Sequence, residues 1–505
     1  MKKTMALVLS LVMLLGCFAA LAEYTGAAPV FEEKVTISIL STNGATNENN
    51  VLDMAWWQKV VEKANVNLEL EIIDSSTYND VVQPRLAAGQ DLPDIIKVSG
   101  NRATAIESGL FISLTELIDQ YGYNLANHFE KYPNLKGALT YTDGNIYFIP
   151  YLYTTDSNYR TILLNDGYLA QLGMTKDDIN TVEDLYDYLI QVRDNDLNGN
   201  GDPSDEYPLF CRRMDMMNCI AMYWGIDIPN NGGYSVAEDG TVYCDYITEE
   251  YKEFLEFANK IYSENLVNKD FISANWDMQA AAYTDNAIGA TMDFISNAVD
   301  GSQLSTPGWD FFNDAPVYQI HCIEDVEGNP VVYGRSVMGS YFGISKFCDD
   351  PEAAFKFFDY LYSEEVGLQT WYGTEGYDYE VVDGEYVFSQ EYLNNADAYR
   401  ENSGYNMDAF PGYQYDYSSA MSPMLGAQTR QYSEYTWNPS RLDKYYTAEQ
   451  QAILDTYKTD LGTYFSENAT AFILGTRSLD EWDEYVQGAI DMGVEQVVAV
   501  YQEAQ

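Results

Sequence analysis

The segment VTISILSTNGATNENNVLDMAWWQKVVEKANVNLELEII, residues Val35–Ile73, predicts the class of the fold. Val35–Leu40 and Leu68–Ile73 alternate apolar and polar residues, as strands with one buried face do. Between them, Met54–Ala64 spaces its apolar side chains as one face of a helix. The order strand, helix, strand indicates a βαβ unit and therefore an α/β fold.

Two loops beside this unit are candidate walls of a ligand site. The first follows the first strand, spans Ser41–Asn50 and contains Asn43. The second follows a predicted third strand, Asp91–Val98, and contains Asn101. Ligands of open α/β sheets collect outside the carboxyl ends of the strands, so we expect both asparagines to face a cleft.

The length and charge of the chain limit its architecture and its partners. A chain of 505 residues, 46% of them hydrophobic, is longer than one compact domain is expected to be, so at least two lobes are predicted. The formal net charge of −51 argues against nucleic acid or an anionic membrane surface as a partner. The same acidity also keeps an exported protein soluble.

The N-terminus carries a targeting signal. Met1–Ala22 contains two early lysines, an apolar run and a final Ala-Leu-Ala, which together predict a secretory signal peptide. The alternative is a lipoprotein signal, because Leu14–Cys17 resembles a lipobox in which Cys17 would be acylated. Either signal predicts an extracellular protein, secreted or lipid-anchored to the outer face of the cytoplasmic membrane.

An acidic loop, RDNDLNGNGDPSDEYP at Arg193–Pro208, follows a helix that Thr181 is expected to cap. Its oxygen-rich side chains, without His or Cys, favour a structural Ca²⁺ ion, and Gly199 would supply the sharp turn of such a loop. The ligand register can be counted from Asp194 or from Asp196, and an ordinary turn rich in Asn, Asp and Gly is the alternative. The candidate ligands are Asp194, Asp196, Asn198, Asn200, Asp202, Asp205 and Glu206.

The cysteines and histidines indicate no catalytic or metal chemistry. Besides Cys17 the chain has five cysteines, and none of them has the spacing of a metal or redox motif. They are therefore expected to be small buried thiols. The two histidines, His128 and His321, lie outside any motif and are expected to be structural.

Several sequence segments point to one family. The acidic loop reads DxNxNGxxxDEYP from Asp196, and DLPDII (91–96), DPEAAFKFFDYL (350–361) and TRSLDEWDEY (476–485) are further marked segments. In this order they resemble the family 1 extracellular solute-binding proteins of ABC importers, especially the oligosaccharide-binding branch typified by alginate-binding proteins. The acidic pair of the loop arrives one residue later than in the family. The resemblance covers about Val35–Gln505.

The resemblance implies a periplasmic-binding-protein-like type 2 fold, with two α/β lobes joined by a hinge and a ligand cleft between them. We expect residues 34–150 and 287–338 in lobe 1, and residues 151–286 and 345–505 in lobe 2. The chain is expected to cross between the lobes near 151–158 and 338–345. Such a protein captures a carbohydrate, in particular an oligosaccharide, and delivers it to the ABC permease membrane subunits; a monomer is expected.

The candidate ligand-binding residues lie at predicted strand ends, crossovers or loops between elements. Aromatic side chains among them can stack on sugar rings, although core packing is the alternative for each tryptophan. The tyrosine-rich residues 397–440 are expected to form loops on or beside the cleft. The candidates are Asn43, Trp56, Asn101, Tyr151, Tyr153, Trp224, Trp276, Asp293, Arg335, Trp371 and Glu375.

Two other functions share some of these sequence features. A secreted glycoside hydrolase would need two carboxylates about 5–9.5 Å apart across a sugar bond. The 78 acidic residues of the chain leave such a pair open, but the resemblance to solute-binding proteins, segment by segment, decides against a hydrolase, so no enzymatic activity is expected. A calcium-dependent adhesin would be expected to show internal repeats, and the sequence has none.

Overall fold

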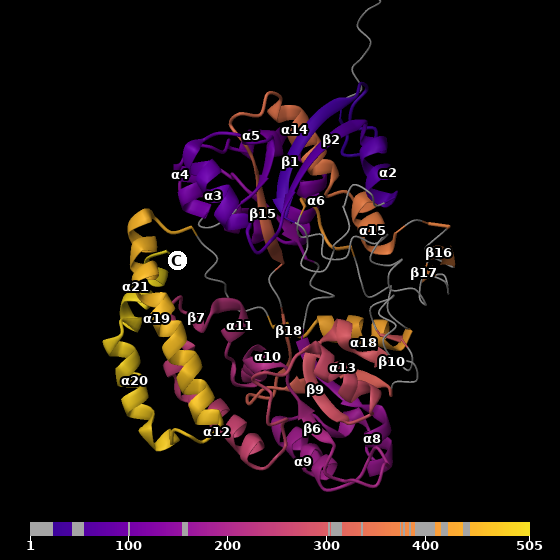
Figure 1. Cartoon of the computed structure of the whole chain (residues 1–505), viewed down its shortest axis with the longest axis vertical. Helices are drawn as coiled ribbons and strands as arrows, with labels where there is room; N and C mark the ends of the chain where they lie inside the picture. Colours follow the sequence, from indigo (N-terminus) through magenta and orange to yellow (C-terminus); the bar gives the residue numbers. More distant parts are fainter. Residues whose placement is uncertain are drawn as a thin grey trace, which may run out of the picture.

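The computed structural model describes residues 24–42, 55–98, 102–153, 160–300, 303–304, 316–334, 337–373, 375–376, 379–382, 385–388, 410–415, 423–437 and 445–504. They form two lobes, each built around its own sheet, with the chain passing several times between them (Figure 1). The α/β class predicted from the sequence is therefore confirmed.

The first sheet has five strands in the order β2-β1-β3-β15-β4. Its strands are β1 (Val35–Thr42), β2 (Val66–Ile73), β3 (Ile95–Lys97), β4 (Ile149–Leu152) and β15 (Met338–Ile344). β1 runs parallel to β2 and β3, and helix α2 (Ala55–Ala64) connects β1 to β2, so the predicted βαβ unit is present. β15 is antiparallel to both of its neighbours.

Helices from two distant parts of the chain cover this sheet (Figure 1). They are α3 (Tyr78–Ala88), α4 (Arg102–Glu107), α5 (Thr115–Tyr121), α6 (Tyr123–Lys131), α7 (Leu135–Leu139), α14 (Pro351–Tyr360) and α15 (Glu364–Tyr372). The Asp-Pro pair at 350–351 is a sequence signal for a helix start, and helix α14 begins there: the Asp350 side chain accepts from the Ala353 N–H, and Pro351 takes the first helical position. The buried carboxylate of Asp359 in α14 accepts from the Tyr24 hydroxyl at 2.8 Å, which fastens the N-terminal segment to this lobe.

The second sheet follows the order β13-β14-β5-β9-β6, with β12 beside β5 and β18 beside β14. Its strands are β5 (Arg160–Asn165), β6 (Tyr207–Phe210), β9 (Ile288–Phe294), β12 (Tyr318–His321), β13 (Ile323–Glu324), β14 (Pro330–Tyr333) and β18 (Thr436–Trp437). The helices of this lobe are α8 (Asp166–Leu172), α9 (Val182–Arg193), α10 (Arg213–Ile220), α11 (Ile228–Asn231), α12 (Glu249–Ser263), α13 (Trp276–Thr284) and α18 (Pro423–Ser433).

Three C-terminal helices pack along the second lobe, where Figure 1 shows them in yellow. They are α19 (Ala448–Ile473), α20 (Trp482–Asp491) and α21 (Val494–Glu503), which contact α12 and the small hairpin of β7 (Tyr234–Val236) and β8 (Val242–Cys244). Just before α19, Tyr445 instead packs on the first lobe, with its ring 5.1 Å from that of Tyr141 and 4.9 Å from the Arg102 guanidinium. The C-terminal arm therefore touches both lobes.

The structure corrects the predicted lobe boundaries. Residues 287–338 were expected in lobe 1, but β9 pairs with β5 and β6 in the second sheet. The expectation that residues 345–505 all belong to lobe 2 is also wrong, since α14 and α15 cover the first sheet. The segment 338–345 is not a crossover, because most of it is β15, and the chain passes between the lobes before it, after β14. A strand pattern predicts a strand, but it does not predict which sheet the strand joins.

In the part of the chain that the structure describes, no helix is long and apolar enough to cross a membrane.

The five cysteines after the N-terminal segment are all free; four are buried and Cys348 is half-buried, which is close to what was expected. His321 is buried, with Nε2 hydrogen-bonded to the Ile179 carbonyl, and burial lowers its pKa to about 4. This histidine is therefore neutral and structural.

Candidate functional site

The two sheets present their ends to the crossovers between the lobes. In the first sheet, Met338 at the start of β15 pairs with Leu152 at the end of β4, so the carboxyl ends of β1, β3 and β4 share one edge. Tyr153, just beyond β4, donates its N–H to the Val337 carbonyl at 2.8 Å, which joins the two crossovers. Both Asn43 and Asn101, which follow β1 and β3, lie outside the described residues.

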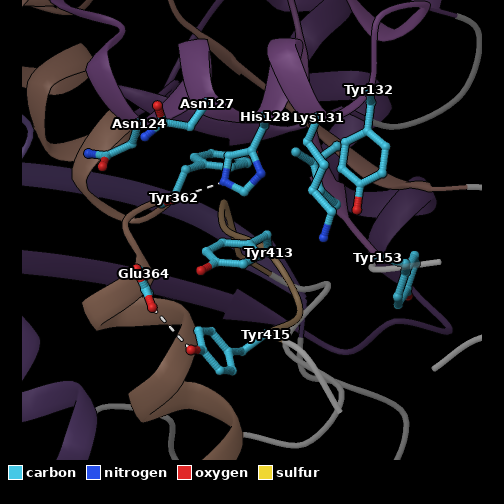
Figure 2. Close-up of a pocket in the computed structure, with 11 residues that line it drawn as sticks. Asn124, Asn127, His128, Lys131, Tyr132, Tyr153, Tyr362, Glu364, Tyr413 and Tyr415 are labelled. Carbon is cyan, nitrogen blue, oxygen red and sulfur yellow. Dashed lines mark hydrogen bonds between the residues drawn. The ribbon is translucent and has the colours of Figure 1, made fainter. Parts of the chain in front are cut away.

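A pocket of about 280 Å³ opens beside the end of β4 (Figure 2). Its wall is formed by α6, the start of α15 and the segment 410–415, which pairs with β4 through Leu152 N–H to Gly412 O (3.0 Å) and Gln414 N–H to Leu152 O (2.7 Å). The lining residues are Asn124, Asn127, His128, Lys131, Tyr132, Leu152, Tyr153, Tyr362, Glu364, Tyr413 and Tyr415.

The pocket combines aromatic faces with hydrogen-bonding groups, as Figure 2 shows. His128 Nε2 lies 3.0 Å from the Tyr362 carbonyl, so this nitrogen carries the proton and donates it. Burial lowers the pKa of His128, so the ring stays neutral at physiological pH. Its ring lies 4.4 Å from that of Tyr413, and the neighbouring Tyr415 hydroxyl donates to Glu364 at 3.1 Å.

Tyr413 reaches this position because residue 367 is a glycine. A Cβ atom at Gly367 would lie 2.6 Å from the Tyr413 ring, so any side chain there would displace the ring. Tyr413 and Tyr415 lie in a loop segment beside this pocket, as expected, but neither residue was singled out from the sequence. The expectation of loops is wrong for Pro423–Ser433, which form helix α18. Their partners in α6 and α15 are distant in sequence, and no local pattern identifies such contacts.

A second cluster lies at the end of the second sheet that faces the crossovers. Arg160, the first residue of β5, pairs with Phe294 at the end of β9, and its guanidinium lies 4.3 Å from the centre of the Phe294 ring. Because β6 runs parallel to β9, Arg212, which follows β6, comes beside Asp293. Trp276, the first residue of α13, lies against the same arginine, with the guanidinium 5.1 Å from its ring.

Asp293 organises this second cluster. It is fully buried, and its carboxylate accepts from Arg212 Nη2 at 2.6 Å, from Gln279 Nε2 at 2.8 Å and from Asn297 Nδ2 at 2.9 Å. The structure thus brings together two predicted residues, Trp276 and Asp293, through Arg212. Sequence reasoning missed Arg212, although a pair of basic residues directly after a strand in so acidic a chain was a usable signal.

The acidic loop between α9 and β6 winds around Asp196. The Asp196 carboxylate accepts from the N–H groups of Gly199 (2.8 Å) and Gly201 (2.9 Å), and Gly199 has the left-handed φ of 75° expected for the sharp turn. Asn198 and Asn200 accept from the N–H groups two residues further on. Asp194, by contrast, is exposed and pairs with Arg193.

Glu206 closes this loop from the inside. It is only 8% exposed, and its Oε1 accepts from the N–H groups of Leu197 (2.9 Å) and Asn198 (3.2 Å). Its Oε2 is buried and has no hydrogen-bond partner among the residues described. The side-chain amides of Asn198 and Asn200 donate to Asp205. Within the described ranges, no group of three or more His, Cys, Asp or Glu side chains is arranged as a metal cluster.

Residues 48–368 match the model of a family described as bacterial extracellular solute-binding protein. The chain belongs to this family. The resemblance seen in the sequence is therefore confirmed, and the two end-of-sheet clusters are parts of a solute-binding protein.

Relatives of this solute-binding protein include curated and structurally determined proteins. Lipoprotein LipO of Bacillus subtilis is 25% identical over 419 residues, which are 80% of this chain and 78% of LipO. The fructooligosaccharide ABC transporter substrate-binding protein FusA of Streptococcus pneumoniae is 25% identical over 291 residues, 54% of this chain and 52% of FusA. The crystal structure of alginate-binding protein AlgQ2 without calcium ion is similar to this chain, with a TM-score of 0.69 and 22% sequence identity. The match covers 94% of this chain and 98% of AlgQ2.

An extracellular solute-binding protein from Bifidobacterium longum subsp. infantis has a TM-score of 0.74 at 18% identity, over 93% of this chain and 97% of its own. At these identities the structural likeness shows the fold alone. It confirms the predicted periplasmic-binding-protein-like architecture with two lobes.

The remaining predicted ligand residues of this solute-binding protein are dispersed. Tyr151 is 3% exposed and Trp224 is 9% exposed; the first packs edge-on to Tyr153, and the second packs against Phe254 and Phe257. Both belong to hydrophobic cores, as the core alternative for Trp224 predicts, and their contact with a ligand stays a prediction. Glu375 is exposed. Arg335 lies outside the described residues, and the side chains of Trp56 in α2 and Trp371 in α15 are not among those described.

Proposed function

We propose that this protein captures a carbohydrate, in particular an oligosaccharide, outside the cell and hands it unaltered to the membrane subunits of an ABC importer. The observation that carries the proposal is the position of two aromatic and polar clusters at the crossover ends of the two lobes. The names of two relatives support it: FusA is named for fructooligosaccharide, and YtcQ of Bacillus subtilis, 23% identical over 340 residues, for polygalacturonan and rhamnogalacturonan binding.

The side chains of the two clusters suit sugars. Aromatic rings such as Tyr413 and Trp276 offer flat apolar faces to the C–H faces of a sugar ring. The side-chain amide of Asn127 can both donate to hydroxyls and accept from them, whereas the Asn124 amide already donates to Gly26 O and Asp359. Since the chain passes between the lobes through short connections, closure of the lobes over a ligand would bring the two clusters together.

Capture without bond cleavage is proposed because Asp293 in the second cluster and Glu364 in the pocket are already engaged by donors. Hydrolysis of a glycosidic bond needs one carboxyl group as an acid and a second as a base or nucleophile, on either side of the bond. Asp293 is fully buried beneath three side-chain donors, and Glu364 in the pocket accepts from Tyr415. Neither is presented as a free acid or base.

The proposal is tested by a glycan array on the purified protein, followed by isothermal titration of the best ligands. We expect tight binding, a smaller radius of gyration in the complex by small-angle scattering, and recovery of the intact sugar after overnight incubation. Shortened products that disappear when one carboxylate is changed would establish the hydrolase instead.

We also propose that the acidic loop holds a structural Ca²⁺ ion. The support is the buried Glu206 Oε2 without a partner, which a cation would satisfy, and the winding of the loop around Asp196. One structural relative is described as AlgQ2 without calcium ion and another as a FusA EF-hand mutant. Asp196, Asn198, Asn200, Asp202, Asp205 and Glu206 would supply the oxygen ligands. Asp194 is engaged by Arg193, so the register counted from Asp196 is favoured.

For its location we propose the outer face of the cytoplasmic membrane, as a monomer. The relative LipO is named a lipoprotein, and residues 1–23, with Cys17, lie outside the described residues. Labelling with a palmitate analogue should mark the protein and fail to mark Cys17→Ser. Release of unlabelled protein into the medium would instead favour cleavage after Ala22.

A further inference from the structure

We propose that Arg212 and Trp276 form a subsite that takes an uncharged sugar ring rather than a uronate, and that Asp293 sets this preference as a positioning residue. The inference rests on the proposed binding of carbohydrate and adds the class of sugar accepted at one place in the site. It also changes the role of Asp293, which was predicted to contact the ligand itself.

The three residues converge at the crossover end of the second sheet. The parallel pairing of β6 with β9 matches Phe210 to Thr291, so the chain leaving β6 passes Asp293 two residues later, at Arg212. Helix α13 begins at the same end, because the chain after it enters β9 from the opposite end of the sheet. Its first residue, Trp276, is only half-buried and lies over the Arg212 guanidinium.

The charge of Arg212 is cancelled within the protein. Arg212 Nη2 and Asp293 Oδ1 are 2.6 Å apart, and the two side chains are 11% and 0% exposed, so water screens the pair weakly. Gln279 and Asn297 hold the carboxylate from other sides, so Asp293 cannot turn away to release the arginine. A uronate carboxylate would have to compete with this fixed partner and would be repelled by it.

Two unused polar atoms in the cluster match a hydroxyl group better than a carboxylate. Arg212 Nε, a donor, and Gln279 Oε1, an acceptor, are both buried without a hydrogen-bond partner in the described part of the chain. Once the groups that cover these atoms move aside, a sugar hydroxyl would accept from the first and donate to the second. A carboxylate can only accept, so it would leave the Gln279 oxygen unsatisfied, which is costly in a buried position.

The Trp276 ring completes the subsite with a face for stacking. An aromatic face attracts the C–H groups of a neutral sugar ring and carries the negative side of its quadrupole toward them. The same negative face is unfavourable to an anion. The Arg212 donor, the Gln279 acceptor and the Trp276 side chain thus all favour an uncharged sugar ring.

The test uses the full mature chain and an array that pairs neutral oligosaccharides with acidic ones of similar size, including fructo-, galacto- and gluco-oligosaccharides against oligogalacturonates and alginate oligomers. Titration then gives Kd for the best neutral and the best acidic probe. We expect the neutral probe to bind at least about tenfold more tightly. In Asp293→Asn, which frees the Arg212 charge, this preference should fall by about tenfold or more. In Asp293→Asn combined with Arg212→Gln, which removes both charges, it should return.

The outcomes separate the two levels of the proposal. Preference of the unaltered protein for acidic probes, or an unchanged preference in Asp293→Asn, overturns the neutral subsite and leaves carbohydrate capture standing. Failure to bind any glycan overturns the proposed function itself. Where Asp293→Asn does not fold, Trp276→Ala decides the matter: we expect a cooperative melt at a somewhat lower temperature, because Trp276 packs against a hydrophobic core, and about tenfold weaker binding of the neutral probe. Unchanged binding overturns the subsite.

Discussion

The effect of Glu206→Gln on the stability of the protein should reverse when calcium is added. This makes the substitution the sharpest test of the acidic loop. The substitution keeps the volume of the side chain, and the retained oxygen can still accept from the N–H groups of Leu197 and Asn198. The buried oxygen that lacks a partner becomes an NH₂ group, which donates hydrogen bonds and repels a cation. Without calcium the variant should be at least as stable as the unaltered protein, because it removes a buried charge.

In the presence of calcium, the unaltered protein should instead be more stable than the variant. A ligand present at a hundredfold excess over its Kd adds about 2.7 kcal/mol to the free energy of unfolding. For a cooperative unit of about 150–250 residues, 1 kcal/mol shifts Tm by about 2–4 °C, so the unaltered protein should gain about 5–10 °C. The variant should gain little. Scanning calorimetry in millimolar calcium and in excess EGTA measures both shifts.

Asp194→Asn is the matched control. Asp194 is exposed and pairs with Arg193, so its loss should leave the calcium shift intact. If this variant instead abolishes the shift, the register counted from Asp194 is correct. Identical melts of the unaltered protein with and without calcium, together with no metal by elemental analysis, would refute the calcium site altogether.

Three further outcomes are expected. Gly367→Ala should push the Tyr413 ring out of the pocket wall and weaken oligosaccharide binding by about tenfold; unchanged Kd would show that this pocket is not part of the site. Burial raises the pKa of Asp245 to about 7 from its ordinary 3.8, so the folded state binds the proton more tightly and the free energy of unfolding falls as pH rises from about 4 to 7. Asp245→Asn should remove this slope and stabilise the protein at pH 8 by about 2–4 kcal/mol in urea titrations. If the stability of the variant falls with pH as steeply as that of the unaltered protein, the role of Asp245 is refuted. Tyr24→Phe, which removes a donor from the buried Asp359, should lower the free energy of unfolding by about 1–3 kcal/mol. An unchanged free energy of unfolding would show that water replaces the hydroxyl.

Local patterns in the sequence predicted local structure well. The strands and helix of Val35–Ile73 follow from apolar spacing, and the cap at Asp350 follows from the chemistry of two residues. Thr447 with Gln450, and Ser478 with Glu481, have the spacing that predicts a capping box. The box at Thr447 is present. The box predicted at Ser478 is not, because Ser478 accepts from the Asp480 N–H and begins a 3₁₀ turn. In each of these cases the determining contacts lie within a few residues.

Features that depend on distant contacts were predicted poorly. Ile288–Phe294 reads as a buried strand in either sheet, and only pairing with β5 and β6 decides between them. Arg212 becomes part of the candidate site through Asp293, which is 81 residues away. The wall formed by Tyr413 depends on the absence of a side chain at Gly367. Apolar periodicity carries no information on such pairings.

The place of β15 in the first sheet has a consequence for how the chain folds as it is made. β15 lies between β3 and β4, yet it follows the whole of 160–334 in sequence. The first lobe, although its chain begins to emerge first, cannot close its sheet until residue 344 is available. Strands β5, β6, β9, β12, β13 and β14 of the second sheet are all complete earlier. A nascent chain therefore exposes the unpaired edges of β3 and β4 while residues 153–337 are made, and pairing across so long a separation makes folding slow.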